Sequence, residues 1–170
     1  YKGKKDNNYF LCTNNVYAII EDTLKNLWVG TDYGLNFLNR KTGRFTYYHS
    51  NPSNKNSISF NDIKALAIDD KSNLWIGTNK GGLNYLDIAN KQFHHLKNNP
   101  NDSTSLANNK VYSLLFDSNK NLWVISSKNG YLTPTEVQML PHNNNKFINL
   151  KDNCAFGIVE SHTDNFWFGG

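Results

Sequence analysis

Apolar and polar positions along the chain follow one pattern that occurs four times. In the first copy, Val16, Ala18 and Ile20 fall on every second position, which is the period of a β-strand. The corresponding segments at residues 63–68 and 111–116 are apolar on both faces, which is typical of strands that are buried on both sides. Each copy is therefore predicted to begin with a strand.

A turn and a second strand follow each of these segments. The first copy reads Asp-Thr-Leu-Lys-Asn and then Leu-Trp-Val-Gly-Thr. Aspartate bonds to its own backbone and asparagine tolerates a positive φ angle, so the first five residues predict a tight turn. The next five predict a strand that returns antiparallel to the first.

Three residue types keep a fixed register in this turn and second strand. The tryptophan lies twelve positions after the first apolar residue, and successive tryptophans are 47, 48 and 44 residues apart. A period in this range indicates an array of one supersecondary unit. We interpret the tryptophans as packing residues and the aspartates, replaced in the fourth copy by Ser161, as turn caps. The repeat residues are Trp28, Trp75, Trp123, Trp167, Asp22, Asp69, Asp117, Asn26, Asn73, Asn121 and Asn165.

Two further strands complete each unit. A glycine-marked turn leads to a predicted third strand, and a short fourth strand ends the unit. Four antiparallel strands in about 45 residues are typical of a β-propeller blade. The third strands are predicted at residues 35–38, 83–87 and 131–133, and the fourth at 45–48, 93–96 and 147–150. The third unit is also expected to carry an extended loop that includes Pro134, Pro141 and residues 143–145.

The fold class predicted is all-β: a β-propeller fragment with about three and a half four-stranded antiparallel blades. The expected boundaries are 16–48, 63–96 and 111–150 for whole blades, 155–170 for a half blade, and 1–15 for a linker from a preceding blade. Propellers close with about four to eight blades, and closure protects their strand edges. We therefore expect a piece of a longer protein whose open edges favour self-association.

Composition narrows the classes of function. The chain is 38% hydrophobic but 14% aromatic, which suits thin blade cores filled by large rings. Its net charge of +4 comes from scattered lysines, so no nucleic-acid surface is expected. No stretch reads as a membrane span or a signal peptide. Cys12 and Cys154 are expected to be free thiols, because a bridge between them would cross the channel mouth.

The chain carries no pattern for catalysis, a metal or a cofactor. One aspartate in each turn, without further carboxylates at ligand spacing, favours turn capping over calcium binding. His94 and His95 are adjacent on a predicted strand, so they point to opposite faces and do not chelate one metal together. No nucleophile motif and no glycine-rich phosphate loop occurs.

These motifs resemble a known family. The run Asp-x-x-x-Asn-Leu-Trp-(Val/Ile)-Gly-Thr, then Gly-Leu-Asn-(Phe/Tyr)-Leu and a linker such as NPNDSTSLANNKV, resembles the two-component regulator propeller repeat over nearly the whole chain. The third copy departs from this repeat at Ile125-Ser126, where Gly-Thr is expected. The fourth departs from it at Ser161.

The resemblance implies a function that composition does not. Such repeats build the periplasmic sensor region of hybrid two-component systems, especially in glycan-degrading Bacteroidetes. The resemblance implies two seven-bladed propellers, a β-sandwich domain, a membrane span, a histidine kinase and a DNA-binding module in the complete protein. It also implies a periplasmic location and an oligosaccharide ligand, with homodimerisation of the parent protein. This segment itself is expected to be no enzyme and to contact the membrane only through other parts of the parent.

The turns between second and third strands and the linkers between blades are expected to emerge on one face. We call this the loop face; it comprises the turns at 32–33, 79–80 and 127–128 and the linkers 49–61 and 97–110. Its amide and charged groups suit sugar hydroxyls, an aromatic ring can stack on a sugar, and function often lies on loops held by a rigid scaffold. The candidate ligand-binding residues are Tyr33, His49, Lys55, Lys80 and Lys128.

Two other classes of function stay open. A propeller can serve only for protein contacts or dimerisation, without a small ligand. A streptogramin-lyase-like enzyme has similar repeats, but it needs a convergent His/Glu site and usually a metal, and the five histidines of this chain are scattered. Fold alone does not decide between these classes.

Overall fold

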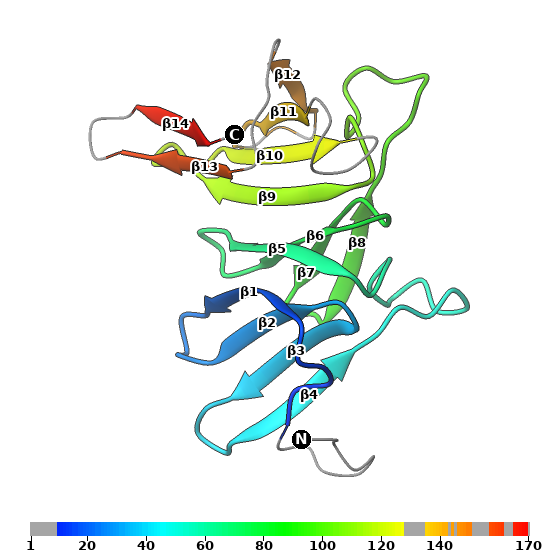
Figure 1. Cartoon of the computed structure of the whole chain (residues 1–170), viewed down its shortest axis with the longest axis vertical. Coiled ribbons are helices and arrows are strands. Elements are labelled where there is room, and N and C mark those ends of the chain that lie inside the picture. Colours follow the sequence, from blue (N-terminus) through cyan, green and yellow to red (C-terminus); the bar gives the residue numbers. More distant parts are fainter. Residues whose placement is uncertain are drawn as a thin grey trace.

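The computed structural model describes residues 10–127, 135–142, 144, 146–150, 157–161 and 165–169. Within these ranges the secondary structure consists of strands, arranged in four antiparallel sheets (Figure 1). The first sheet contains β1 (Val16–Glu21), β2 (Leu27–Thr31), β3 (Gly34–Asn39) and β4 (Arg44–Tyr48). The second contains β5 (Ile63–Ile68), β6 (Leu74–Thr78), β7 (Leu83–Asp87) and β8 (Gln92–Leu96). The third contains β9 (Val111–Phe116), β10 (Leu122–Ser127), β11 (Thr135–Leu140) and β12 (Ile148–Leu150), and the last pairs β13 (Gly157–Glu160) with β14 (Phe166–Gly169).

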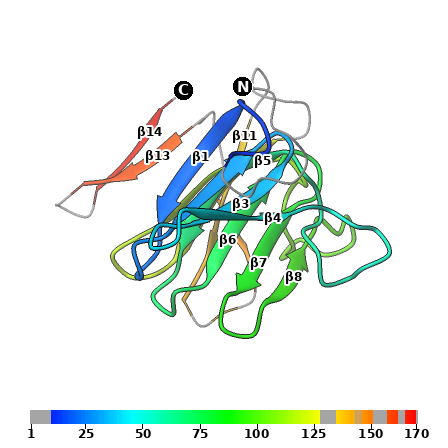
Figure 2. The same cartoon turned by 90° about the horizontal axis from the view of Figure 1, so that it is seen from below.

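These sheets are the predicted propeller blades, three with four strands and one with two. In each complete sheet the strands pair in chain order, so every blade is a meander. The blades are stacked face to face, and the inner strands β1, β5 and β9 are neighbours (Figure 1). Figure 2 shows β4 at a wide angle to β1, which is the twist expected of a four-stranded sheet.

One predicted strand position was wrong. The third strand of the third blade is Thr135–Leu140, in the segment that we expected to be an extended loop, whereas residues 131–133 lie outside the described residues. The pairing runs without a break from Ser127 opposite Thr135 to Leu122 opposite Leu140. It buries Gln138 and Leu140, and this burial favours β-structure over a loop. The additional residues of this repeat therefore lie between β10 and β11.

Small residues of one blade allow the inner strand of the next blade to approach closely. A Cβ atom on Gly30 would lie 2.7 Å from Cγ2 of Ile63, and a Cβ atom on Gly77 would lie 2.7 Å from Cγ1 of Val111. Ile125 occupies the equivalent position in the third blade, where it is buried in one cluster with Ile158 of the half blade. The Gly-Thr glycine therefore sets the distance between blades.

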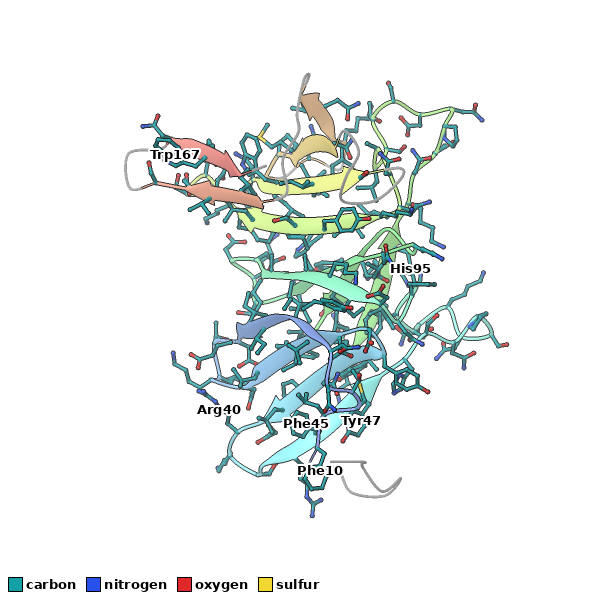
Figure 3. All side chains as sticks on the ribbon, viewed as in Figure 1. Phe10, Arg40, Phe45, Tyr47, His95 and Trp167 are labelled. Atoms are coloured by element: carbon teal, nitrogen blue, oxygen red, sulfur yellow. The ribbon has the colours of Figure 1, made fainter. Side chains whose placement is uncertain are left out.

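The repeat tryptophan of each whole blade faces the blade that follows it in the chain. Trp28 is 2% exposed and belongs to the cluster that joins the first two blades. Trp75 meets the ring of Phe116 at 6.2 Å, and Trp123 meets that of Phe166 at 4.4 Å. Trp167, at the end of the stack in Figure 3, is 69% exposed. The tryptophans of the three whole blades thus lie between sheets.

The repeat aspartates close the turn after each inner strand. Asp69 Oδ1 accepts hydrogen bonds from the backbone N–H of Lys71 at 3.0 Å and of Asn73 at 2.8 Å. Its Oδ2 accepts from Asn73 Nδ2 at 3.1 Å and from Trp75 Nε1 at 3.2 Å. Equivalent backbone bonds run from Asn26 to Asp22 and from Asn121 to Asp117. The turn-capping interpretation therefore describes these aspartates.

The positive φ angle in these turns does not fall on asparagine. It falls on the residue before it, with φ of 66° at Lys25, 64° at Ser72 and 66° at Lys120. The asparagine instead uses its side chain. Asn121 donates from Nδ2 to the Asp117 carboxylate and accepts from the backbone N–H of His142 at 3.0 Å. This links the two turns at the same end of the blade.

Candidate functional site

The loop face forms as predicted, because the turns and linkers bond to one another at one end of the blades. The backbone N–H of Asn79 donates to the carbonyl of Asp62, the residue before β5 in the chain, at 2.9 Å. The backbone N–H of Ser127 donates to the carbonyl of Lys110, the residue before β9 in the chain, at 3.1 Å. Figure 1 shows both blade-to-blade linkers projecting on the same side, opposite the β1–β2 and β5–β6 turns. The face is therefore a set of loops fixed on a rigid stack of sheets.

Tyr33 and His49 are brought together on this face. The Tyr33 side chain is 60% exposed, and its ring lies edge-on to the His49 imidazole with ring centroids 5.3 Å apart. His49 Nδ1 lies 2.8 Å from the Tyr33 carbonyl oxygen, so the ring nitrogen in its protonated form donates to it. Gly34 has a φ of 137°, and an added Cβ would lie 2.7 Å from the Tyr48 carbonyl. The two rings form a small aromatic platform with restricted movement.

The three lysines occupy different places. Lys80 is exposed on the β6–β7 turn of the second blade, next to Gly81, whose carbonyl accepts from Ser59 Oγ at 2.9 Å. Lys55 is exposed in the part of the linker that runs beside β8, where the neighbouring Asn56 accepts from the Phe93 N–H at 2.8 Å. Lys128 lies outside the described residues. Lys80 therefore belongs to the same face as Tyr33, one blade further on, whereas Lys55 lies at the outer edge of the second blade.

Two carboxylates of the loop face remain ionised well below neutral pH. The pKa of Asp32 is lowered chiefly by a 2.6 Å hydrogen bond from Asn15 Nδ2. The pKa of Asp102, in the second linker, is lowered chiefly by a hydrogen bond from the Thr104 hydroxyl at 2.7 Å. The face thus offers anionic acceptors as well as lysine donors, and both kinds of group bond hydroxyls.

Sequence reasoning missed a set of buried amides that hold the linkers in place. Asn84 on β7 is fully buried; its Oδ1 accepts from the Ser59 N–H at 2.9 Å and its Nδ2 donates to Ser59 Oγ at 2.8 Å. Gln138 on β11 accepts from the Ala107 N–H at 2.6 Å. Asn36 on β3 is bonded in the same way to the Cys12 N–H. The signal was the asparagine of Gly-Leu-Asn, a polar residue in the middle of a predicted strand.

Other tempting side chains do not converge. His94 lies against the Tyr85 ring, with centroids 5.4 Å apart, while His95 Nε2 lies 2.8 Å from the Ser57 carbonyl (Figure 3 labels His95). The two histidines therefore point to opposite faces, as predicted. Among the described residues, no group of three or more histidine, cysteine, aspartate or glutamate side chains could hold a metal ion. Cys12 carries a free thiol, and Cys154 lies outside the described residues.

The comparisons with known proteins agree with this architecture. A family model described as two component regulator propeller matches three times, at residues 11–33, 57–80 and 105–128. Each match runs from a linker through the first two strands of a blade into or next to a loop-face turn. Three successive repeats of the chain are therefore similar to the two component regulator propeller repeat. No curated protein matches the chain in sequence.

Solved structures extend this likeness. The extracellular domain of a protein described as the hybrid two component system BT3049, from B. thetaiotaomicron, matches with a TM-score of 0.79 and 26% identity, over 94% of this chain and 22% of that one. The extracellular domain described for BT4673, from the same organism, matches with a TM-score of 0.55 and 16% identity, over 94% of this chain and 27% of that one. A streptogramin B lyase matches with a TM-score of 0.60 and 18% identity, over 91% of this chain and 47% of that one.

These matches differ in what they support. The last two are similar to this chain in fold alone. The repeats and the likeness to the BT3049 domain support a propeller of the sensor type, and the chain spans less than a third of each sensor domain. In the described part of the chain, no helix has the length and apolar character that a membrane crossing needs.

Proposed function

We propose that this chain is part of the ligand-sensing ectodomain of a hybrid two-component sensor, that it lies in the periplasm, and that the sensor recognises an oligosaccharide. The likeness to an extracellular sensor domain supports the class. The observation that carries the choice of ligand is the aromatic platform of Tyr33 and His49 among amide-rich loops. An exposed ring held in place loses little conformational entropy when a sugar stacks on it.

In this proposal the loop face binds the sugar through a few side chains. Tyr33 stacks on a ring of the glycan, His49 Nε2 accepts from a sugar hydroxyl, and Lys80 and Lys128 donate to the glycan's oxygens. Lysine adds salt-sensitive attraction when the glycan carries sulfate or carboxylate groups. Ligand binding changes the activity of a kinase in another part of the parent protein. The parent protein acts as a homodimer.

Calorimetry on the whole protein that carries this chain tests the proposal, with a panel of neutral and sulfated oligosaccharides. The variants Tyr33→Ala, Lys80→Ala and Lys128→Ala are expected to weaken binding about tenfold each, as loss of a contact residue often does. Lys41→Ala is the matched control, because Lys41 is exposed in the β3–β4 turn at the other end of the blade. Unchanged affinity in all three variants would remove the loop face as the site. A panel without any binding glycan would favour a protein-interaction scaffold instead.

A further inference from the structure

A cleft lies between the second and third blades, at the end of the stack opposite the loop face. Its volume is about 370 Å³, which is at the lower end of the range for small-molecule sites. Trp75, Tyr85 and Phe116 supply aromatic walls, and Leu122 and Leu140 supply buried apolar lining. The rim is polar and consists of Asp69, Asp70, Lys71, Lys120, His142 and Asn144.

The equivalent place between the first and second blades is closed. There the Tyr48 ring lies 5.8 Å from Trp28 and 5.8 Å from Phe93, and Ile88 packs against the same cluster. As a result Trp28 is buried, whereas Trp75 is half-buried. At the closed interface these side chains therefore fill the space that is open in the cleft.

Two substitutions between repeats open the cleft. By strand register, Leu96 is equivalent to Tyr48. His142 is equivalent to Ile88, because each lies two residues after the last residue of the third strand that pairs with the second strand. The first change removes an aromatic ring, and the second exchanges an apolar side chain for an exposed imidazole. A third change, Phe37 to Tyr85, adds a hydroxyl to the same wall as Trp75. The first change makes this interface larger, and the other two make it more polar.

The tryptophan of the cleft is held in one orientation. Its Nε1 donates to Asp69 Oδ2, and its ring lies 5.0 Å from that of Tyr85. The rim is tied across the two blades by an ion pair between Lys120 Nζ and Asp70 Oδ2 at 2.8 Å. At the closed interface the equivalent residues are Thr23 and Ser72, whose hydroxyls lie 3.5 Å apart. The cleft is therefore a preformed cavity, with both sides fixed before any ligand enters.

The chemistry of the lining selects a class of ligand. Two carboxylates are balanced by two lysines, and Asp70 and Asp69 already accept from cationic or N–H donors, so the cleft does not call for a charged ligand. Aromatic faces bind the apolar C–H faces of ring-shaped molecules, while carboxylates, lysine and imidazole bond hydroxyl groups around the rim. An electrically neutral ring with hydroxyl groups on its edge fits these requirements.

We infer that the cleft between β6–β7 and β9–β11 is a second saccharide site, in which one end of a neutral oligosaccharide lies against the aromatic wall of Trp75 and Tyr85. This goes beyond the proposed function, because it concerns a different surface and stands even if the loop face binds nothing. The opposite faces of one propeller would then contact different parts of a glycan, or two different glycans.

The test titrates the chain with maltotriose, cellotriose and xylotriose, and follows binding by calorimetry and by tryptophan fluorescence. At least one of these neutral probes is expected to bind and to change the fluorescence. The double variant Leu96→Tyr, His142→Ile copies the closed interface, so it is expected to keep the melting temperature and to weaken binding at least about tenfold. Lys41→Ala, in the β3–β4 turn of the first blade and outside both proposed sites, is the control and is expected to bind as the unchanged chain does.

Two variants at exposed positions test saccharide binding in the cleft without changing the packing of the core. Lys71→Ala and His142→Ala alter exposed rim residues, so they are expected to fold normally and to weaken binding about threefold or more each. The inference is overturned if no probe binds. It is also overturned if the double variant Leu96→Tyr, His142→Ile folds and binds as tightly as the unchanged chain. If the double variant does not fold, the inference is overturned when both rim variants bind as tightly as the unchanged chain. A loss of affinity in Lys80→Ala alone would instead support the loop face and contradict the cleft.

Discussion

The Asn84 side-chain amide bonds to Ser59 through both its oxygen and its nitrogen. Oδ1 accepts from the Ser59 N–H at 2.9 Å, and Nδ2 donates to Ser59 Oγ at 2.8 Å. Ser59 belongs to the linker that leads into β5, so this bond attaches a loop-face segment to the middle of its blade. A buried amide in this position makes the loop face part of the scaffold.

Removing this amide should destabilise the blade. Asn84→Leu leaves the half-buried Ser59 N–H without its acceptor, and such a loss costs about 1–3 kcal/mol of unfolding free energy. Urea unfolding of this variant and of Asn119→Leu, which changes an exposed asparagine of the β9–β10 turn, provides the comparison. Equal stability of the two variants would show that the amide bonds do not fix the linker.

The turn-capping aspartate should be only partly replaceable by serine. Asp69→Ala removes the acceptor for two backbone N–H groups, an amide and an indole, so we expect a loss of about 2 kcal/mol. The fourth repeat has Ser161 at this position, and its Oγ accepts from the Asn165 N–H at 3.3 Å. Asp69→Ser should therefore lose less than Asp69→Ala in thermal melts. The reverse order would contradict the proposed role of the carboxylate.

Much of this framework could be predicted from sequence, because the repeat fixes it. Strand periodicity, the aspartate turn and the tryptophan register recur, so each copy supports the others. The strand at Thr135–Leu140 was missed since two prolines and several asparagines lie around it, and only its pairing with β10 shows that it is a strand. Lys25, Ser72 and Lys120 were not expected at positive φ, because their side chains give no sign of it.

The candidate sites were harder to predict than the fold. The chain has 29 asparagines, so the few that are buried on third strands do not stand out by composition. The cleft is also invisible in a single repeat. It results from Leu96 on one blade and His142 on the next, which both line it, and only the register between repeats shows what each replaces.

Stability should fall in acid, and the ion pair across the cleft should contribute to this. Lys120 lowers the pKa of Asp70, chiefly through its hydrogen bond, so the unfolded chain binds more protons than the folded chain in the acid range. This contribution is present above the ordinary aspartate pKa of about 4 and is lost as the pH falls through the lowered folded value. Lys120→Met should therefore show a smaller loss of stability between neutral and acid pH than Lys55→Met, which changes an exposed lysine of the linker between the first two blades. Identical pH profiles of melting temperature would argue against the pair.

The exposed apolar side chains at the two ends of the stack should cause self-association. Ile19 on β1 is 63% exposed, and Val159 and Trp167 on the last hairpin are 63% and 69% exposed. Such faces, next to an edge of β14 that has no partner strand among the described residues, favour contact with another chain. Light scattering should give a mass that rises with concentration, and Val159→Lys with Trp167→Lys should reduce that rise. A monomer at every concentration would contradict this expectation.

The stacked-blade architecture requires that the repeat tryptophan of each whole blade packs against the next blade, so the unfolding free energies of Trp75→Ala and Trp167→Ala are its most direct test. Trp75 lies between two blades while Trp167 is exposed, so Trp75→Ala should lose about 3 kcal/mol, at the low end for a packed aromatic residue because its ring also borders the cleft. Trp167→Ala should stay within about 0.5 kcal/mol of the unchanged chain, as exposed substitutions do. A loss below about 1 kcal/mol for Trp75→Ala, or equal losses for the two variants, would contradict the stacked-blade architecture and the sites built on it.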